Sequence, residues 1–564
     1  MDFEQVMDKC GSFGRYQILL LILFSCSNIL SSLHYFAQTI ISFTPKHSCV
    51  QPEIASNGLQ IFHNNTLSRC SFIELNENTG ELNMAAKCQA WEYERESGYE
   101  SVTTELNWVC DDAYKLAVGQ SFFFLGSVVG TISVGYVADR FGRLPACVLT
   151  TLMGATGDFI TSFVNNLQLF SLGRFISGFS TDTVYMLMFI LVFEYLSPKR
   201  RTFGLNIVSA VFYTLTLMIS PWLAIWVGTW RHYLWVASLP ALVVLAYPCL
   251  VFESAEWLLT KQRYDKAANC LRRIAKINRR QVDESVFEEF KDFYRNKTME
   301  QAKFNTQKDT FMDMFRTPRM RKFTIILLIK SIIITVAFDI ISRNMEGIGT
   351  SPFKLFSYTG IAHLPSGLTI ILFQNYIGRK GMACASLFFG GIITAVTGYL
   401  LATLDPAENA ILMAFMVGLA RYGATVAYDA EAQYAAEIIP TSVRGRGVAN
   451  IHVIGYGFGF CSSYIIYLGT FYKPLPALFI SVLMLIGAAL CLTLPETQNK
   501  KLPQTVADGE IFGIGEKWFF FSCFSRRRRQ KEEQFPTAAV STIIISSASK
   551  SGNNELNKFN TFTF

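Results

Sequence analysis

Charged residues inside apolar stretches are the residues of this chain that most clearly indicate a functional site. Asp429 and Glu431 lie in a segment that begins with the apolar run 411–420. A carboxylate inside a membrane costs about 2.5–3.5 kcal/mol on insertion scales, so it normally faces a cavity or a charged partner. At about 100° per residue the two side chains point about 200° apart, so only one of them can line a given face. An acid that faces a cavity would indicate a pathway for a solute. The alternative is that both acids pair with neighbouring helices.

Asp339 is a third acid of this kind, in the apolar segment 323–343. Lys330 precedes it by nine residues, about 180° around a helix, so it cannot neutralise Asp339 within that helix. We expect Lys330 to snorkel toward Arg321 and Lys322 instead. An unneutralised acid at this position would attract a cation.

Other kinds of chemistry have no support in the sequence. We find no nucleotide-binding loop, no metal-ligand spacing and no nucleophile–base pairing. The net charge of +7 does not indicate nucleic-acid binding, because the cations cluster beside apolar runs. An ATP-driven pump, a metal site, a cofactor and an enzyme are therefore not expected.

Composition predicts a multi-pass membrane protein. Hydrophobic residues make up 51% of the 564 residues and charged residues only 16%, against about 25% charged in an ordinary soluble domain. Helices are the default because the backbone must satisfy its own hydrogen bonds in lipid. The expected fold is all-α, with twelve spans at about 16–39, 115–138, 145–164, 167–195, 203–227, 232–252, 323–343, 355–377, 382–403, 409–436, 446–470 and 474–494.

These spans divide the chain into five parts. We expect a cytoplasmic N-terminus at 1–15, a six-helix half at 16–252, a central intracellular loop at 253–322, a second six-helix half at 323–495 and a cytoplasmic tail at 496–564. The first span has no small-residue cleavage site before or after it, so it is read as retained. In the central loop, 266–280 predicts a solvated or membrane-surface helix.

Loop 43–112 is expected on the extracellular side of the cell membrane. Lys and Arg gather in the short loops on the other side, which positive-inside bias makes cytoplasmic, together with both termini. Four cysteines share the loop, which favours two disulfides in one of three connectivities: Cys49, Cys70, Cys88 and Cys110. Asn64 begins a glycosylation sequon there.

The two halves echo each other. DRFGR at 139–143 is echoed by NYIGRK at 375–380, and EYLSPKRR at 194–201 by EIIPTSVR at 437–444. Such repeats pack about a site near the membrane midplane and rock around it. Charged residues of the echoed loops would form an inner gate whose pairs exist in one state only; its members are Asp139, Arg140, Arg143, Glu194, Arg201, Glu437 and Arg444. The alternative is a topology signal with local helix capping.

The same stretches resemble the organic cation, carnitine and organic anion transporters of the major facilitator superfamily. The similar motifs are GYVADRFGR (135–143), ESAEWLL (253–259), TELNWVCDD (104–112), EIIPTSVRGRG (437–447) and LPETQNKKLP (494–503). The opening residues 1–17 resemble insect members that carry carcinine or β-alanine. The chain departs from the family motifs at Phe252, Ala255, Glu256 and Asn375, and we expect those loops to gate differently from the family's.

The resemblance implies a set of substrate-facing positions. Asp429 follows Tyr428 as an acid does in the similar cation transporters, so we assign it to the cavity and Glu431 to a helix interface. Asp339 falls on a substrate-facing position, and Asp182 on one where those transporters carry a base. Arg421, eight residues before Asp429, would meet a substrate carboxylate or, as an equal alternative, tether helices. The remaining candidates are His363, where the alternative is a buried hydrogen-bonded histidine, and Tyr35, Tyr185, Phe338, Tyr428 and Tyr456 as aromatic faces for a cation.

These features predict a plasma-membrane transporter of small organic cations or zwitterions that works by alternating access. The anion-carrying branch has bases where this chain has Gly367 and Tyr456, and the acid that the cation branch has in span eleven is absent here. An organic anion transporter and a non-transporting membrane sensor are the alternatives. The terminal residues Phe562–Phe564 have the form that some PDZ-type domains bind by strand addition.

Overall fold

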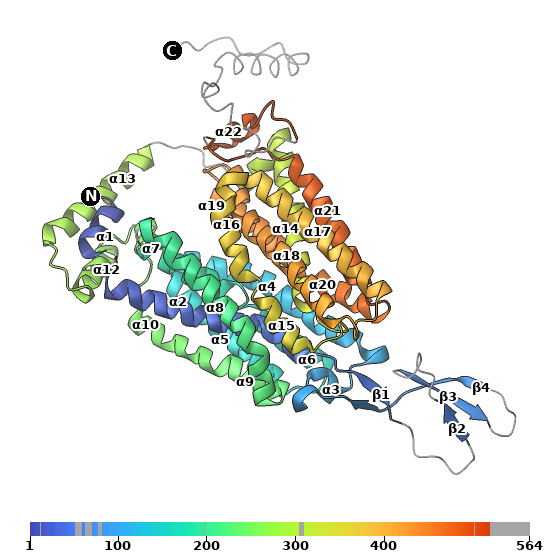
Figure 1. Ribbon diagram of the computed structural model, residues 1–564. Coiled ribbons are helices and arrows are strands. Elements are labelled where there is room, and N and C mark those ends of the chain that lie inside the picture. The colour runs from blue at the N-terminus through green and yellow to red at the C-terminus, as the bar shows by residue number, and fades with distance from the viewer. Residues whose placement is uncertain are drawn as a thin grey trace, which may run out of the picture.

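The chain folds into two helical halves that lie side by side (Figure 1). The computed structural model describes residues 1–11, 13–50, 59–62, 70–76, 82–196, 198–303, 310–500 and 502–518. Within these ranges, twelve helical segments are long and apolar enough to cross a membrane. The predicted all-α membrane architecture with twelve spans is confirmed.

The first half holds six spans, two of them broken. They are α2 (Arg15–Ile41), α4 (Tyr114–Phe141), α5 (Arg143–Thr161), α6 (Leu167–Gly178) with α7 (Thr183–Tyr195), α8 (Pro198–Val227), and α9 (Trp230–Ser238) with η3 (Leu239–Ala246) and α10 (Tyr247–Leu250). Asp182 sits in the break between α6 and α7 with φ +65°. A non-glycine residue held in that region is strained, and such residues gather at functional sites.

The second half repeats this arrangement. Its spans are α14 (Pro318–Arg343), α15 (Pro352–Gly360) with α16 (His363–Ile377), α17 (Arg379–Thr403), α18 (Ala410–Ile438), α19 (Arg444–Gly457) with α20 (Gly459–Tyr467) and η5 (Leu468–Thr470), and α21 (Leu475–Leu492).

The echo between the halves extends to individual hydrogen bonds. Gly142 and Gly378 turn the chain between the second and third span of each half with φ +121° and +99°, which only glycine adopts without strain. Glu253 then accepts the backbone N–H of Arg143 at 2.8 Å, and Glu496 accepts that of Arg379 at 3.0 Å. A glutamate just after the last span of each half therefore caps the third span of the same half.

The segment between α2 and α4 contains two small antiparallel sheets that the sequence did not predict. In one, β1 (His47–Cys49) pairs with β5 (Trp91–Tyr93); the other has the order β2 (Leu59–Phe62), β3 (Ser71–Asn76), β4 (Leu82–Lys87). Cys49 is bonded to Cys88 and Cys70 to Cys110. Short helices follow at η1 (Glu96–Gly98), α3 (Val102–Leu106) and η2 (Cys110–Asp112). Asn64 and the C-terminal residues Phe562–Phe564 lie outside the described residues.

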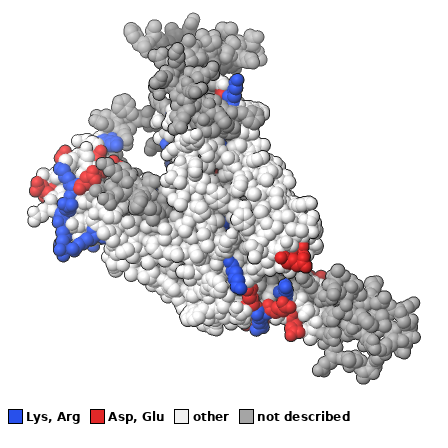
Figure 2. All heavy atoms as spheres, viewed as in Figure 1, with Lys and Arg blue, Asp and Glu red and all other residues white. Residues whose placement is uncertain are grey.

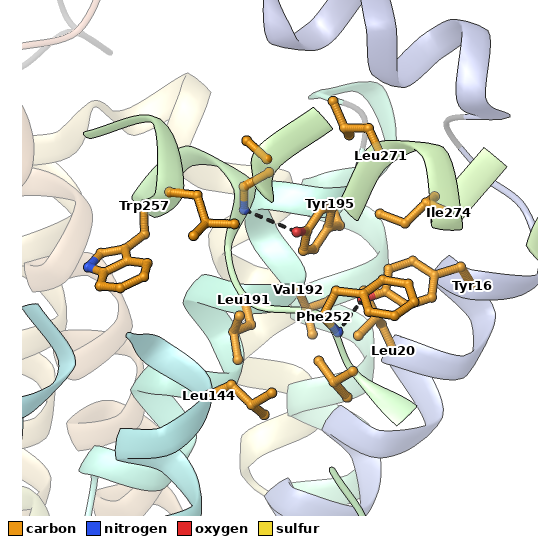
Figure 3. Packing of buried hydrophobic residues seen from close by; sticks show 14 of the residues in the cluster. Tyr16, Leu20, Leu144, Leu191, Val192, Tyr195, Phe252, Trp257, Leu271 and Ile274 are labelled. Atoms are coloured by element: carbon orange, nitrogen blue, oxygen red, sulfur yellow. Dashed lines mark hydrogen bonds between the residues drawn. The ribbon is translucent and has the colours of Figure 1, made fainter. Parts of the chain in front are cut away.

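The segment that links the two halves packs mainly on the first half, and its last turn packs on α14 of the second half. The linking elements are α11 (Ala255–Thr260), α12 (Tyr264–Ile277), α13 (Glu284–Lys303) and η4 (Phe311–Phe315); α1 (Phe3–Gly11) packs against α12 and α13, and α22 (Val506–Ile511) follows the last span. Figure 3 shows the core of the first half against which α11 and α12 pack. In this core Phe252 stacks on Tyr16, with 5.1 Å between the ring centroids. The Tyr195 hydroxyl donates to the carbonyl of Glu253 at 2.6 Å. Phe252, a departure from the family motif, is therefore a packing residue of this core.

The halves meet at one end and separate at the other (Figure 1). At the end near the sheets, Phe43 packs on Phe353 with ring centroids 5.1 Å apart, and Ser357 donates to the carbonyl of Met218 at 2.9 Å. At the end near the termini, α7 and α19 diverge in the view of Figure 1. Figure 2 shows Lys, Arg, Asp and Glu gathered at the two ends, with a broad uncharged band between them. The contacts between the halves near the sheets therefore lie at the end opposite the termini.

Candidate functional site

An ion pair joins the two halves in the middle of their spans. His452 Nε2 on α19 lies 2.7 Å from Asp182 Oδ2 at the start of α7. Both side chains are partly exposed, and the His452 ring packs on Tyr456 with centroids 4.8 Å apart. The strained backbone at Asp182 thus presents a carboxylate to the opposite half.

An aromatic cluster borders this contact. Phe338 on α14 packs on Tyr428 of α18 at 5.1 Å and on His363 of α16 at 5.8 Å between centroids. His363 in turn packs on Tyr213 of α8 at 4.8 Å, which links the cluster to the first half. Tyr185 stands apart, in a row with Phe24 and Phe189 of the first half. Of the predicted aromatic residues, Phe338 and Tyr428 thus lie together beside His363, whereas Tyr185 packs within the first half.

Asp339 is neutralised, contrary to the sequence prediction. Arg343 lies one helical turn later, with Nη2 2.6 Å and Nε 2.8 Å from Asp339 Oδ2. Tyr35 donates to Oδ1 at 2.9 Å and Ser462 to Oδ2 at 2.5 Å. Arg343 also donates to Gln120 of α4 at 2.8 Å. Asp339 therefore organises a buried network between the halves and is not a free counter-charge.

Arg421 is the opposite case, a buried charge without a hydrogen-bond partner. Its side chain is 1% exposed, and none of its three guanidinium nitrogens has a hydrogen-bond partner among the described residues. It lies over the rings of Phe338 and Phe356, at 5.6 and 6.0 Å from their centroids. Leaving such a group unsatisfied is costly, so a buried guanidinium without an acceptor indicates a place for an anionic group.

Asp429 is the acid of α18 for which we expect a place in the cavity. Its side chain is exposed although it lies within the α18 span. Ala432 and Gln433, three and four residues later on the same helix face, are exposed as well. No ion pair holds Asp429 among the described residues. Arg421, Asp339 and Asp429 are all near enough to the Tyr213 hydroxyl to act on it electrostatically.

Glu431 lies at a helix interface, also as predicted, but its partner corrects a second expectation. Lys330 Nζ lies 2.5 Å from Glu431 Oε2, and the Lys330 side chain is fully buried. Lys330 therefore does not snorkel toward Arg321. The packing of α14 on α18 brings Lys330 to Glu431, and this packing cannot be predicted from the sequence of α14 alone.

The predicted gate residues bond within their own halves in this conformation. Arg143 pairs with Asp139 at 2.6 Å, and Glu437 pairs with Arg379 at 3.2 Å. The other described side chains behave alike: Arg140 donates to Tyr136, Ser254 donates to Glu194, and Arg444 donates to the carbonyl of Ile439. The side chain of Arg201 lies outside the described residues. The expected pairing across the interface is absent among these described side chains, since the ends that carry them are apart.

Asn375, the departure in the second loop motif, keeps its contact. Its Oδ1 accepts from Arg379 Nη1 at 2.8 Å. An amide in place of the acid thus replaces an ion pair by a hydrogen bond from the guanidinium to a neutral acceptor.

Several residues of the site were missed from sequence. Arg343 follows Asp339 by four residues, a spacing that indicates a helical ion pair, whereas His452 and Tyr213 had no such local signal. A further buried network was also missed: Asp158 of α5 accepts from Arg174 at 2.7 Å and contacts His34 of α2 at 2.6 Å. This network ties three spans of the first half together.

Comparison with known proteins agrees with this geometry. The family model described as sugar (and other) transporter matches residues 72–507. Among curated proteins, the chain is similar to an organic cation transporter-like protein of Drosophila melanogaster, with 26% identity over 91% of this chain and 93% of that protein. It is also similar to the organic cation/carnitine transporter 2 of Homo sapiens, with 25% identity over 90% and 93% of the two chains.

Solved structures share the fold. A partially occluded inward-open conformation of the xylose transporter XylE from E. coli aligns with a TM-score of 0.54 and 14% identity, over 86% of this chain and 100% of that one. A D-xylose-proton symporter aligns with a TM-score of 0.56 at 14% identity, over the same shares of the two chains.

Proposed function

Because the chain belongs to the sugar (and other) transporter family, a family of multi-pass membrane transporters, we propose that it carries small organic zwitterions and cations by alternating access. Curated relatives described as organic cation and organic cation/carnitine transporters support the solute class. The contact between the halves at one end supports the mechanism, since rocking about the central site would move that contact to the other end.

The observation that carries the proposal is the pair of unneutralised charges on α18. Arg421 is buried without a hydrogen-bond partner, and Asp429 is exposed without an ion pair among the described residues. The Asp339–Arg343 and Asp182–His452 contacts each combine an acid with a base. Arg421 and Asp429 therefore set the charge that a solute meets. One positive and one negative group favour a solute that carries both charges.

The spacing of the two charges selects the solute further. Eight residues of helix place their Cα atoms about 12 Å apart along the axis. An elongated zwitterion, with its ammonium group toward Asp429 and its carboxylate toward Arg421, fits this spacing better than a compact one such as β-alanine. A short zwitterion such as β-alanine would need water bridges to reach both ends. Carcinine, which has an ammonium group but no carboxylate, would meet Asp429 alone. The rings of Phe338 and Tyr428 would lie beside the ammonium group, where a cation gains about 0.5–2 kcal/mol.

We place the protein in the plasma membrane, with both termini cytoplasmic and the sheets between α2 and α4 outside. Positive-inside bias of the loops supports this orientation. Glycosylation at Asn64, disulfides in the external loop and a PDZ-type partner at Phe564 belong to the same proposal. Small organic ions and the bilayer are its expected partners.

The alternative of a non-transporting sensor rested on the departures in the loop motifs. Phe252 packs in the core and Asn375 retains its hydrogen bond, so these departures have structural partners and no longer favour a sensor. The alternative of an organic anion transporter would leave Asp429 facing a like charge.

Uptake into proteoliposomes tests the proposal. A series of amino carboxylates from β-alanine to aminohexanoate would be compared with hexylamine and hexanoate at equal concentration. We expect net flux, with the longer zwitterions preferred and the pure carboxylate poorest. Specific binding without net flux would favour a sensor, and preference for hexanoate would favour an anion transporter; either result would overturn the proposal.

A further inference from the structure

A second site lies at the end of the first half that carries the N-terminus. A pocket of about 370 Å³ opens there between the end of α4 and the helices α11 and α12. Its lining includes three cations, Arg263, Lys266 and Arg273, and two aromatic residues, Phe141 and Trp257. The pocket is remote from the space between the halves, and the transport proposal does not use it.

The cations of α12 share one face of the helix. Lys266, Asn269 and Arg273 occupy positions i, i+3 and i+7, which place them in a row, and all three are exposed. The opposite face, with Ala267 and Leu271, is buried against the protein. Packing therefore fixes which side of α12 is presented, and that side is positive.

These cations are available for a ligand. Arg263 lies 5.8 Å from the Trp257 ring centroid, and Arg273 lies 4.3 Å from that of Phe252. No ion pair neutralises Arg263, Lys266 or Arg273 among the described side chains. The aromatic contacts hold the two guanidinium groups in place while leaving their charge uncompensated.

The other titratable groups of the pocket do not cancel this charge. Glu253 also lines it, but its carboxylate accepts the backbone N–H groups of Arg143 and Ser254 at 2.8 and 3.0 Å. Burial raises the pKa of Glu253, so its anionic form is less favoured than in water. Burial also raises the pKa of the Cys270 thiol to about 11, so this group is neutral at physiological pH.

The pocket lies at the level where the membrane ends. Phe141 is the last residue of the α4 span and is 60% exposed. Trp257 donates its indole N–H to the carbonyl of Asp139 at 3.1 Å, which fixes α11 against the same end of that span. Aromatic side chains of this kind favour the interface between headgroups and acyl chains. Figure 2 shows Lys and Arg, with Asp and Glu among them, at this corner of the molecule, next to the uncharged band.

We propose that this pocket binds the phosphate-bearing headgroup of an anionic phospholipid in the cytoplasmic leaflet, with the acyl chains passing Phe141 along α4. The proposal rests on the cytoplasmic orientation given above. Clusters of Lys and Arg beside a span attract such lipids electrostatically. The exposed aromatic edge, continuous with the span, distinguishes a lipid from a soluble phosphate, which would gain nothing from it. Binding there would hold the helices α1, α12 and α13 against the membrane.

Binding to the purified full-length protein tests this site without any measurement of transport, so failure of the transport proposal leaves the result interpretable. The probes are dioctanoyl phosphatidylinositol bisphosphate, dioctanoyl phosphatidylcholine and soluble inositol trisphosphate. The test variant is Lys266→Gln with Arg273→Gln. The matched control is Lys276→Gln with Arg279→Gln, which removes two exposed cations of the same segment that do not line the pocket.

We expect the anionic lipid to bind, phosphatidylcholine not to bind, and inositol trisphosphate to bind about tenfold more weakly than the lipid because it lacks the chains. The test variant should lose about tenfold or more in lipid affinity, and the control less than about threefold. Equal losses of affinity in both variants, or no loss in the test variant, would refute the assignment of this pocket as the lipid-binding site. Inositol trisphosphate binding as tightly as the lipid would overturn the assignment to a membrane lipid. Elution of each variant as a monodisperse peak is required before binding is scored.

Discussion

Removing the charge of Asp339 should destabilise the protein, whereas removing that of Asp429 should not. Asp339 is 1% exposed and accepts from Arg343 at 2.6 and 2.8 Å, from Tyr35 at 2.9 Å and from Ser462 at 2.5 Å. Asp339→Asn would leave Arg343 buried without its counter-charge. Breaking a buried pair in this way costs about 3–5 kcal/mol. Asp429 is exposed without an ion pair among the described residues, so Asp429→Asn should change stability by no more than about 0.5 kcal/mol.

A double-mutant cycle separates the pair from its surroundings. Asp339→Asn combined with Arg343→Gln removes both charges and leaves two amides that can hydrogen-bond to each other. We expect the double variant to be more stable than Asp339→Asn alone, with a coupling energy of about 2–3 kcal/mol. Thermal unfolding of purified protein, followed by intrinsic fluorescence, gives the four stabilities. Additive losses, or a loss in Asp429→Asn as large as in Asp339→Asn, would refute the assignment of Asp339 as a structural acid.

Three further predictions concern other parts of the molecule. His452→Gln should reduce the fall of the uptake rate on acidification, because only the imidazolium form makes an ion pair with Asp182 that holds the halves together; a wild-type rate that does not fall on acidification would contradict this. Glu437→Ala, which removes the partner of Arg379, should lower the maximal uptake rate more than the apparent affinity; unchanged turnover at equal surface density would remove Glu437 from the gate. Non-reducing peptide mapping should recover Cys49 with Cys88 and Cys70 with Cys110, and Asn64→Gln should remove a glycan; other pairings, or an unglycosylated wild type, would count against an extracellular loop.

Properties that follow from local sequence were predictable. The apolar runs placed the spans because a membrane demands about 20 apolar residues for each crossing helix. The echoed loops placed the two halves, and the caps by Glu253 and Glu496 show the repeat in the backbone. The exposure of Asp429 and the interface position of Glu431 followed from helical periodicity together with the resemblance.

Properties that depend on neighbouring elements were not predictable in the same way. Lys330 pairs with Glu431 because α14 packs on α18, a contact between residues about 100 positions apart. His452 meets Asp182 across the two halves, for which no spacing exists in the sequence. Arg343 is different, because its spacing of four residues from Asp339 on one helix is enough to predict the pair. The strands between α2 and α4 are short and have no long alternation of apolar and polar residues from which they could be predicted.

The central claim is that Arg421 and Asp429 together select a zwitterion. Uptake of aminohexanoate, hexylamine and hexanoate by wild type, Arg421→Gln and Asp429→Asn tests it most directly, since the three solutes share one skeleton. A hydrogen bond to a charged group contributes about 1.5–3 kcal/mol, hence about tenfold to a hundredfold in apparent affinity. Arg421→Gln should lose this factor for aminohexanoate but not for hexylamine, and Asp429→Asn should lose it for both amines but not for hexanoate. If both variants reach wild-type density and keep the wild-type order of the three solutes, the two residues do not contact the solute's charges.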